Sequence, residues 1–165
     1  MRECRLRPPG PVDLSLTLGR LRRAAHDPCL RLGARAARRA TRTAAGPATL
    51  ALEVHGTEVV ASAWGAGADA ALDQVPELLG FDDDPAAFTP GPGLVRDLHR
   101  RSPGLRLGRT AAVVEALVPA VIEQRVAGVE SARAYRSLVR RYGEPAPGPF
   151  DLLLPPDPGL LAALP

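Results

Sequence analysis

The sequence predicts an α+β protein in which an antiparallel sheet is followed by helices. Between residues 39 and 65, three short stretches alternate in the period-2 pattern of strands, and tight turns at Gly46-Pro47 and His55-Gly56 join them. Strands joined by such short turns run antiparallel, since parallel strands need a long crossover. After residue 93 the period-2 pattern gives way to apolar residues at helical spacing. The expected architecture is a sheet with helices on one face, followed by an all-helical part.

The first 81 residues supply the predicted sheet and its helices. Residues 1–11 are rich in proline and are expected to form a flexible arm. Residues 12–18 alternate apolar and polar side chains, which predicts a strand, and a short helical turn follows up to Asp27-Pro28. Residues 30–38 fit a strand or a helix equally well. The remaining predicted elements are strands over 39–45, 48–56 and 57–65 and a helix over 66–81, which is expected to kink or end early at Pro76.

A polar stretch rich in proline and glycine, residues 82–93, is the predicted domain boundary. It divides the chain into the arm, an α+β domain over 12–90 and a helical part over 91–165. The helical part is predicted to contain a short helix before Pro103-Gly104 and two longer ones over 112–126 and 129–142, with another helix beginning near the end. The side chains expected to be buried in the two longer helices are Val114, Leu117, Val118 and Val121, and Tyr135, Leu138, Val139 and Tyr142.

Composition narrows the class of protein without naming a function. The content of 45% hydrophobic and 24% charged residues is typical of a soluble globular protein. No apolar run reaches the ~18 residues of a membrane span, and the charged N-terminus does not resemble a secretory signal, so a cytoplasmic location is expected. The net charge is +3, and every basic residue is arginine, a bias that a GC-rich genome explains. The charge therefore permits nucleic-acid binding without arguing for it.

Few residues form a pattern that indicates a catalytic or metal site. The three histidines fall in different predicted elements, and the two cysteines match no metal-ligand spacing. The acidic run Asp82-Asp83-Asp84 precedes a proline, which is typical of a solvated cap. No pair of carboxylates for acid-base chemistry can be singled out. Neither a metal nor a cofactor is expected.

The two helices around residues 121–144, "VIEQRVAGVESARAYRSLVRRYGE", have a polar pair, Gln124-Arg125, just before the Ala127-Gly128 joint. Together with "VDLSLTLGRLRR", "RATRT", "ATLALEVHG", "VVASAWG", "LLGFDDDP" and the longer run from Pro103 to Pro149, this segment resembles the helix-hairpin-helix DNA glycosylases. The similarity is to the 3-methyladenine type, AlkA-like and actinobacterial, over roughly residues 12–149 in collinear order. It implies a first domain like half of a TATA-binding-protein saddle, followed by the helical glycosylase core.

The resemblance implies a role in base-excision repair. Such enzymes bend double-stranded DNA, flip an alkylated base into a pocket and hydrolyse its N-glycosidic bond. A wedge residue fills the gap in the base stack, and the matching positions here are Gln124 and Arg125. The family's usual wedge is apolar; an arginine can stack in the gap and reach a phosphate. Near Gly19 the family places an aromatic residue against the flipped base, and Arg20 occupies that position as the base-pocket wall.

The resemblance ends before the family's Gly-rich DNA-gripping turn and its catalytic aspartate, and neither occurs in residues 1–165. The sequence therefore predicts the N-terminal half of a glycosylase, truncated and inactive by itself, with no catalytic residue in this chain. Two alternatives stay open: a non-catalytic DNA-binding or regulatory module derived from an AlkA-like domain, and a structural α+β protein without a nucleic-acid role. Apolar faces left uncovered on the helices over 112–126 and 129–142 further predict self-association.

Overall fold

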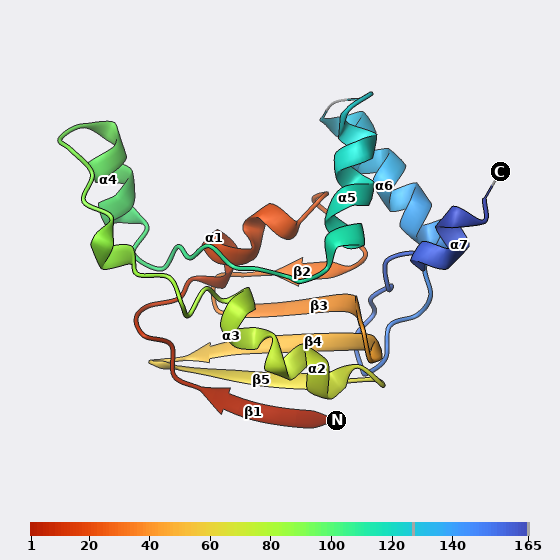
Figure 1. Cartoon of the computed structure of the whole chain (residues 1–165), viewed down its shortest axis with the longest axis horizontal. Helices are drawn as coiled ribbons and strands as arrows, with labels where there is room; N and C mark the ends of the chain where they lie inside the picture. The colour runs from red at the N-terminus through yellow and green to blue at the C-terminus, as the bar shows by residue number, and fades with distance from the viewer. Residues whose placement is uncertain (127, 165) are drawn as a thin grey trace.

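The computed structural model describes residues 1–126 and 128–164, and it shows an α+β fold built on a five-stranded antiparallel sheet (Figure 1). The order of strands across the sheet is β1-β5-β4-β3-β2. The strands are β1 (Arg2–Leu6), β2 (Leu30–Leu32), β3 (Ala36–Thr43), β4 (Gly46–His55) and β5 (Glu58–Trp64). The meander β3-β4-β5 confirms the three predicted strands. The ambiguous residues 30–38 form β2, a turn and the start of β3.

Seven α-helices and two short 3-10 turns lie within the described residues. The helices are α1 (Leu14–Leu18), α2 (Ala68–Asp73), α3 (Val75–Leu78), α4 (Leu94–Arg101), α5 (Val113–Glu123), α6 (Val129–Tyr142) and α7 (Pro158–Ala162). The 3-10 turns are η1 (Gly19–Leu21) and η2 (Pro85–Ala87). The helix predicted over 66–81 is split into α2 and α3. Pro76 lies in the first turn of α3, where a residue without an N–H group costs no hydrogen bond.

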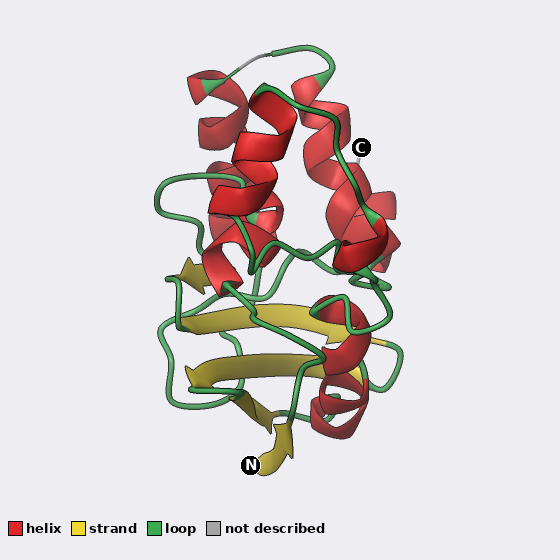
Figure 2. Cartoon of the chain, turned by 90° about the vertical axis from the view of Figure 1, so that its left-hand side faces the viewer, coloured by secondary structure: helices red, strands yellow, loops and turns green. Residues whose placement is uncertain are grey.

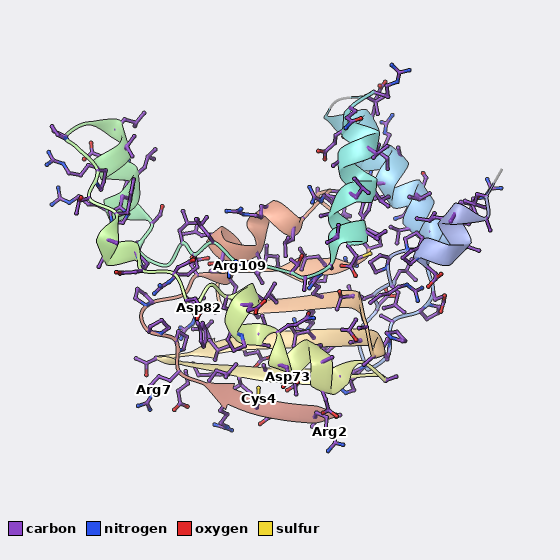
Figure 3. The ribbon with its side chains drawn as sticks, in the orientation of Figure 1. Arg2, Cys4, Arg7, Asp73, Asp82 and Arg109 are labelled. Carbon is purple, nitrogen blue, oxygen red and sulfur yellow. The ribbon has the colours of Figure 1, made fainter. Side chains whose placement is uncertain are left out.

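The flexible arm predicted for residues 1–11 is wrong for Arg2–Leu6, which form the edge strand β1. This strand pairs with β5 and places Cys4 opposite Ala61. Cys4 and Leu6 are half-buried and pack against the main core, whereas their neighbours are exposed. Figure 3 labels Cys4 between Arg2 and Arg7 along this edge. The period-2 signal was therefore present in the sequence, but the charged residues between the apolar ones conceal it.

The strand predicted over residues 12–18 is also wrong, because Leu14–Leu18 form the helix α1. Asp13 caps the helix: its Oδ1 atom accepts hydrogen bonds from the N–H groups of Ser15 at 2.8 Å and Leu16 at 3.0 Å. Leu14 and Leu18 are fully buried, and Leu16 between them is 41% exposed. Alternating leucines contain both a period of two and the i, i+4 spacing of a helix, and the cap decides in favour of the helix.

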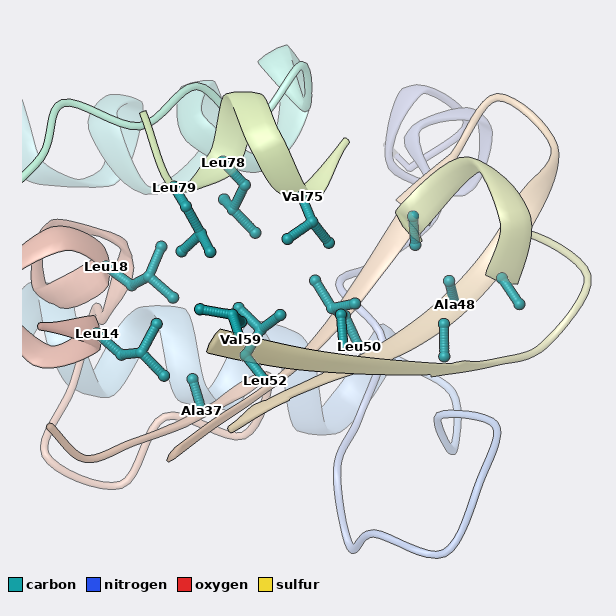
Figure 4. Close-up of a cluster of buried hydrophobic side chains, with 14 residues drawn as sticks. Leu14, Leu18, Ala37, Ala48, Leu50, Leu52, Val59, Val75, Leu78 and Leu79 are labelled. Atoms are coloured by element: carbon teal, nitrogen blue, oxygen red, sulfur yellow. The ribbon is translucent and has the colours of Figure 1, made fainter. Parts of the chain in front are cut away.

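The main core lies between one face of the sheet and the helices α1, α2 and α3 (Figure 4). The side chains of β4 and β5 that point to this face are apolar; those in the buried cluster are at most 2% exposed, and Val54 packs against them partly buried. The sheet contributes Ala37, Ala48, Leu50, Leu52, Val59, Ala61 and Ala63, and the helices contribute Leu14, Leu18, Ala68, Ala71, Val75 and Leu78, with Leu79 directly after α3. Several of the sheet residues are alanines, which allows the short helices to approach the strands closely.

The opposite face of the sheet is covered by the loop that follows α6. Leu152 and Leu154 pack against Ala40 of β3. Phe150 meets the ring of Trp64 edge-on, with 5.1 Å between the ring centroids, and the Arg38 guanidinium lies 4.9 Å from the Phe150 centroid. The sheet is thus covered by helices on one side and by an extended segment on the other.

The segments after residue 90 are joined to the sheet domain by hydrogen bonds. The N–H of Asp13 and the hydroxyl of Thr17 both donate to the carbonyl of Gly104, at 3.0 and 3.1 Å. The N–H of Leu153 donates to the carbonyl of Pro28 at 2.9 Å. Helices α4, α5 and α6 lie beyond the edge of the sheet that β2 forms (Figures 1 and 2). None of the helices in the described residues has the length and apolar character needed to cross a membrane.

Candidate nucleic-acid interface

Helices α5 and α6 form a hairpin that stands away from the sheet and carries Gln124 and Arg125 at its far end (Figure 1). Gln124 is the C-cap residue of α5, and its N–H donates to the carbonyl of Ala120 at 3.2 Å. Both side chains are exposed, and neither makes a hydrogen bond or ion pair with any other described residue. Ala127 of the predicted joint lies outside the described residues. Gly128 has a φ of +60°, which favours glycine where α6 begins.

The base of this hairpin is held to the sheet by Glu115, in the first turn of α5. Its carboxylate accepts three hydrogen bonds from three residues of β3: from Arg39 Nη2 at 2.7 Å, from Thr41 Oγ1 at 2.7 Å and from the N–H of Arg42 at 2.8 Å. The Glu115 and Arg39 side chains are only 17% and 10% exposed. Moving α5 away from β3 would break these hydrogen bonds and leave the Arg39 charge without a counter-charge in its buried position, so the contact holds the base of α5 in place. Sequence reasoning missed this residue; its only signal was one charge in the apolar first half of α5.

Helix α6 is anchored by a second buried cluster, in which Tyr135 and Val139 pack against Cys29. The Tyr135 hydroxyl donates to Cys29 Sγ at 3.8 Å. Burial raises the pKa of Tyr135, and it raises the pKa of the Cys29 thiol to about 12, so both groups stay neutral. Asp27 beside them is 2% exposed and accepts hydrogen bonds from the N–H groups of Arg23 and Cys29. Burial raises the pKa of this carboxyl too, against those hydrogen bonds.

The face of α5 predicted to be buried is largely exposed. Leu117 is 55% exposed and Val121 51%, Val114 is exposed as well, and Val118 is half-buried. The side of α5 that turns inward carries Pro119, which is buried, and Ile122, which packs against the Tyr135 cluster. The prediction for α6 is confirmed for Tyr135 and Val139, while Leu138 and Tyr142 are half-buried. Periodicity identified the apolar stripe of α5 correctly, but it cannot tell a stripe packed within the chain from one left uncovered.

Arg20, the predicted base-pocket wall, lies in the 3-10 turn η1 and is exposed. No hydrogen bond or ion pair among residues 1–126 and 128–164 connects it with Gln124 or Arg125. Gln124 and Arg125, neighbours in the sequence, are thus both exposed at the end of the hairpin, and Arg20 makes no direct polar contact with either.

A groove of about 540 Å³ runs between the exposed side of α5, the β3-β4 turn and α7. Its walls are mainly apolar and include Val113, Val114, Val118 and Leu161. The charged side chains at its edge are bonded to protein groups: Arg42 donates to the Pro155 carbonyl at 2.8 Å and to Glu144 at 2.9 Å. The groove thus presents apolar surface and has no free acid-base pair among the described residues.

The other polar residues singled out in the sequence lie apart from the hairpin end. Asp84 caps η2 by accepting from the N–H of Ala86 at 3.0 Å, as expected of a capping residue. Asp83 accepts from the N–H of Leu107 at 2.6 Å. The described part of the chain contains no group of three histidine, cysteine or acidic residues arranged to hold a metal ion.

The chain thus combines a five-stranded antiparallel sheet with a helical hairpin that is anchored to β3. The structure is similar to that of a 3-methyladenine DNA glycosylase from Archaeoglobus fulgidus, with a TM-score of 0.65 and 18% sequence identity. The similarity covers 86% of this chain and 51% of the glycosylase, so the chain spans about half the length of that protein. The sequence matches no protein-family model and no curated protein.

Proposed function

We propose that this chain contacts double-stranded DNA as part of a glycosylase that removes alkylated bases. The observation that carries the proposal is the exposed pair Gln124-Arg125 at the end of a firmly anchored hairpin, on a fold similar to that of a 3-methyladenine DNA glycosylase. A rigid support matters because a residue that enters a base stack must resist the force of the closing duplex.

Each of the two joint residues has a separate role in this proposal. The Arg125 guanidinium enters the gap left by a flipped base, where it can stack on the neighbouring bases and donate to a phosphate. Gln124 presents an amide that can donate to, and accept from, a base edge or the sugar-phosphate backbone. Arg20, exposed on η1, is the base-pocket wall in this proposal.

Hydrolysis of the N-glycosidic bond is proposed for the glycosylase as a whole and not for these 165 residues by themselves. Residues 1–165 contain no position that matches the family's catalytic aspartate. We therefore expect this chain to bind duplex DNA without releasing an alkylated base, which an abasic-site assay on methylated DNA tests directly. The uncovered apolar face of α5 additionally supports self-association.

The DNA contact is tested by measuring the affinity for a duplex containing one alkylated base across a range of salt concentrations. Arg125→Ala should weaken binding and flatten the slope of log K against log salt by about 0.9, the value for one lost phosphate contact. Arg5→Ala is the matched control, because it removes the same charge from β1, at the far edge of the sheet from the hairpin end (Figure 1). Equal losses for the two variants would reduce the contact to a general charge effect and contradict the proposal.

A further inference from the structure

The strand β1 forms an edge of the sheet that no described residue covers. Arg2–Leu6 pair with β5 on one side, and no other backbone hydrogen bond among the described residues involves this strand. Figures 1 and 2 show β1 as the outermost element of the sheet, with no described segment beyond it, whereas helices lie beyond the edge formed by β2. The outer edge of β1 therefore presents the N–H and carbonyl groups of alternate residues, which can bind another strand.

The side chains of β1 form two rows, one on each face of the sheet. Cys4 and Leu6 are half-buried against the main core, and Arg2 on the same face forms an ion pair with α2 at 3.3 Å. Glu3 and Arg5 lie on the opposite face, where both are exposed, with 3.9 Å between their charged groups. Charges on an edge strand usually prevent pairing, because most strands offer no matching charges. The charges of β1 therefore decide which strand can be added.

Two copies of β1 match each other in one antiparallel register. When Cys4 lies opposite Cys4 of the second copy, each Glu3 lies opposite an Arg5, so both charged pairs have opposite signs. The next registers that keep each row on its own face place Glu3 opposite Glu3, or Arg5 opposite Arg5. Like charges directly opposite each other are destabilising. The matched register also keeps Pro8, which has no N–H group, outside the paired residues.

We infer that β1 binds β1 of a second copy of this chain, antiparallel and about a two-fold axis at Cys4. Such a contact uses the same surface on both molecules, so it closes at a dimer and joins the two sheets into one. The contact lies at the far edge of the sheet from the hairpin end, so Arg125 of both copies stays accessible (Figure 1). It does not rest on the proposed DNA contact, and it uses a surface other than the uncovered face of α5.

The register can be measured because it brings the two Cys4 residues together. Residues directly opposite each other in an antiparallel pair have Cα atoms about 4.5–5.5 Å apart, within the range of about 4.4–6.8 Å that a disulfide requires. The only other cysteine, Cys29, is buried, so Cys4 is the residue that can link two native chains. The paired strands are short, so we expect dimers at concentrations on the order of 100 µM, and DNA affinities measured at nanomolar concentrations concern the monomer.

The test measures the yield of disulfide-linked dimer when dissolved oxygen and a copper catalyst oxidise the chain, read on a non-reducing gel at twice 17.4 kDa. Glu3→Arg and Arg5→Glu each leave only like charges opposite each other, so each variant alone should give about fivefold less dimer than the wild type, or even less. The double variant Glu3→Arg/Arg5→Glu restores opposite charges and should recover the wild-type yield. An equimolar mixture of the two single variants should also recover it, with one copy of each variant in the dimer by mass spectrometry.

Glu123→Arg is the matched control for Glu3→Arg, because it makes the same change in net charge at an exposed position of α5 and should crosslink like the wild type. Single variants that crosslink like the wild type, or a double variant that does not recover, would overturn the pairing. Association in sedimentation velocity without a Cys4-linked product would place the contact elsewhere, such as on α5, and would overturn it too. Each of these results leaves the DNA contact standing, since Arg125→Ala tests that contact separately.

Discussion

Replacing Glu115 by alanine should destabilise the protein far more than its place near the surface suggests. The substitution removes one carboxylate that accepts three hydrogen bonds from β3, at 2.7, 2.7 and 2.8 Å. It also leaves the Arg39 guanidinium, 10% exposed, without its counter-charge. Breaking one partner of a buried pair costs about 3–5 kcal/mol. Since a change of 1 kcal/mol shifts the Tm of a domain of this size by about 2–4 °C, we expect a loss of about 6–20 °C. Glu115→Gln, which keeps one carbonyl acceptor, should fall in between.

The loss is measured by urea denaturation followed by circular dichroism, at a concentration low enough to keep the chain monomeric. Glu123→Ala is the matched control, because this glutamate is exposed on the same helix and should change the free energy of unfolding by less than about 0.5 kcal/mol. The double variant Arg39→Ala/Glu115→Ala should cost less than the sum of the two single variants. The reasoning is refuted if the free energy of unfolding of Glu115→Ala lies within about 1 kcal/mol of the wild-type value. It is also refuted if the losses of the two single variants add up to the loss of the double variant.

Three further predictions concern a buried carboxyl, the two cysteines and a tightly packed glycine. Burial raises the pKa of Asp27 above its ordinary value of 3.8, so the folded state binds this proton more tightly than the unfolded state does. The wild type should therefore gain stability relative to Asp27→Asn as the pH falls through the raised pKa towards 3.8. Urea titrations of both proteins across pH measure the difference, and a parallel pH dependence would contradict the prediction. The Cys29 thiol, which is buried and has a pKa of about 12, should react with a thiol reagent only in denaturant. The half-buried Cys4 should react in the native chain. The number of thiols modified by the reagent before and after unfolding measures the difference. Gly108→Ala would place a β-carbon 1.9 Å from a backbone carbonyl oxygen of α3 and should cost about 1–3 kcal/mol, while Gly91→Ala, with open space around it, should not.

The sequence was a good guide where a pattern had one structural solution. The meander over residues 39–65 is present as β3, β4 and β5, because glycine-containing turns leave alternating strands no other pairing. It misled at residues 12–18, where alternating leucines satisfy a strand and a helix alike and the Asp13 cap decides. The exposed joint residues Gln124 and Arg125 could be selected from the sequence, since polar residues that interrupt an apolar helix stand out. Glu115 could not, because its importance comes from a strand more than 70 residues away.

Local pattern by itself determined the α+β class, the two long helices and the joint between them. Only the tertiary structure decided which faces of those helices are covered. Apolar spacing specifies that a stripe exists on α5, and the same spacing on α6 gives a stripe of which Tyr135 and Val139 are buried. The difference depends on what long-range contacts bring alongside: Cys29 comes to lie against α6, whereas no described residue covers Leu117. Burial is a property of distant segments meeting in space, and a sequence pattern that extends over a few helical turns contains no information about that meeting.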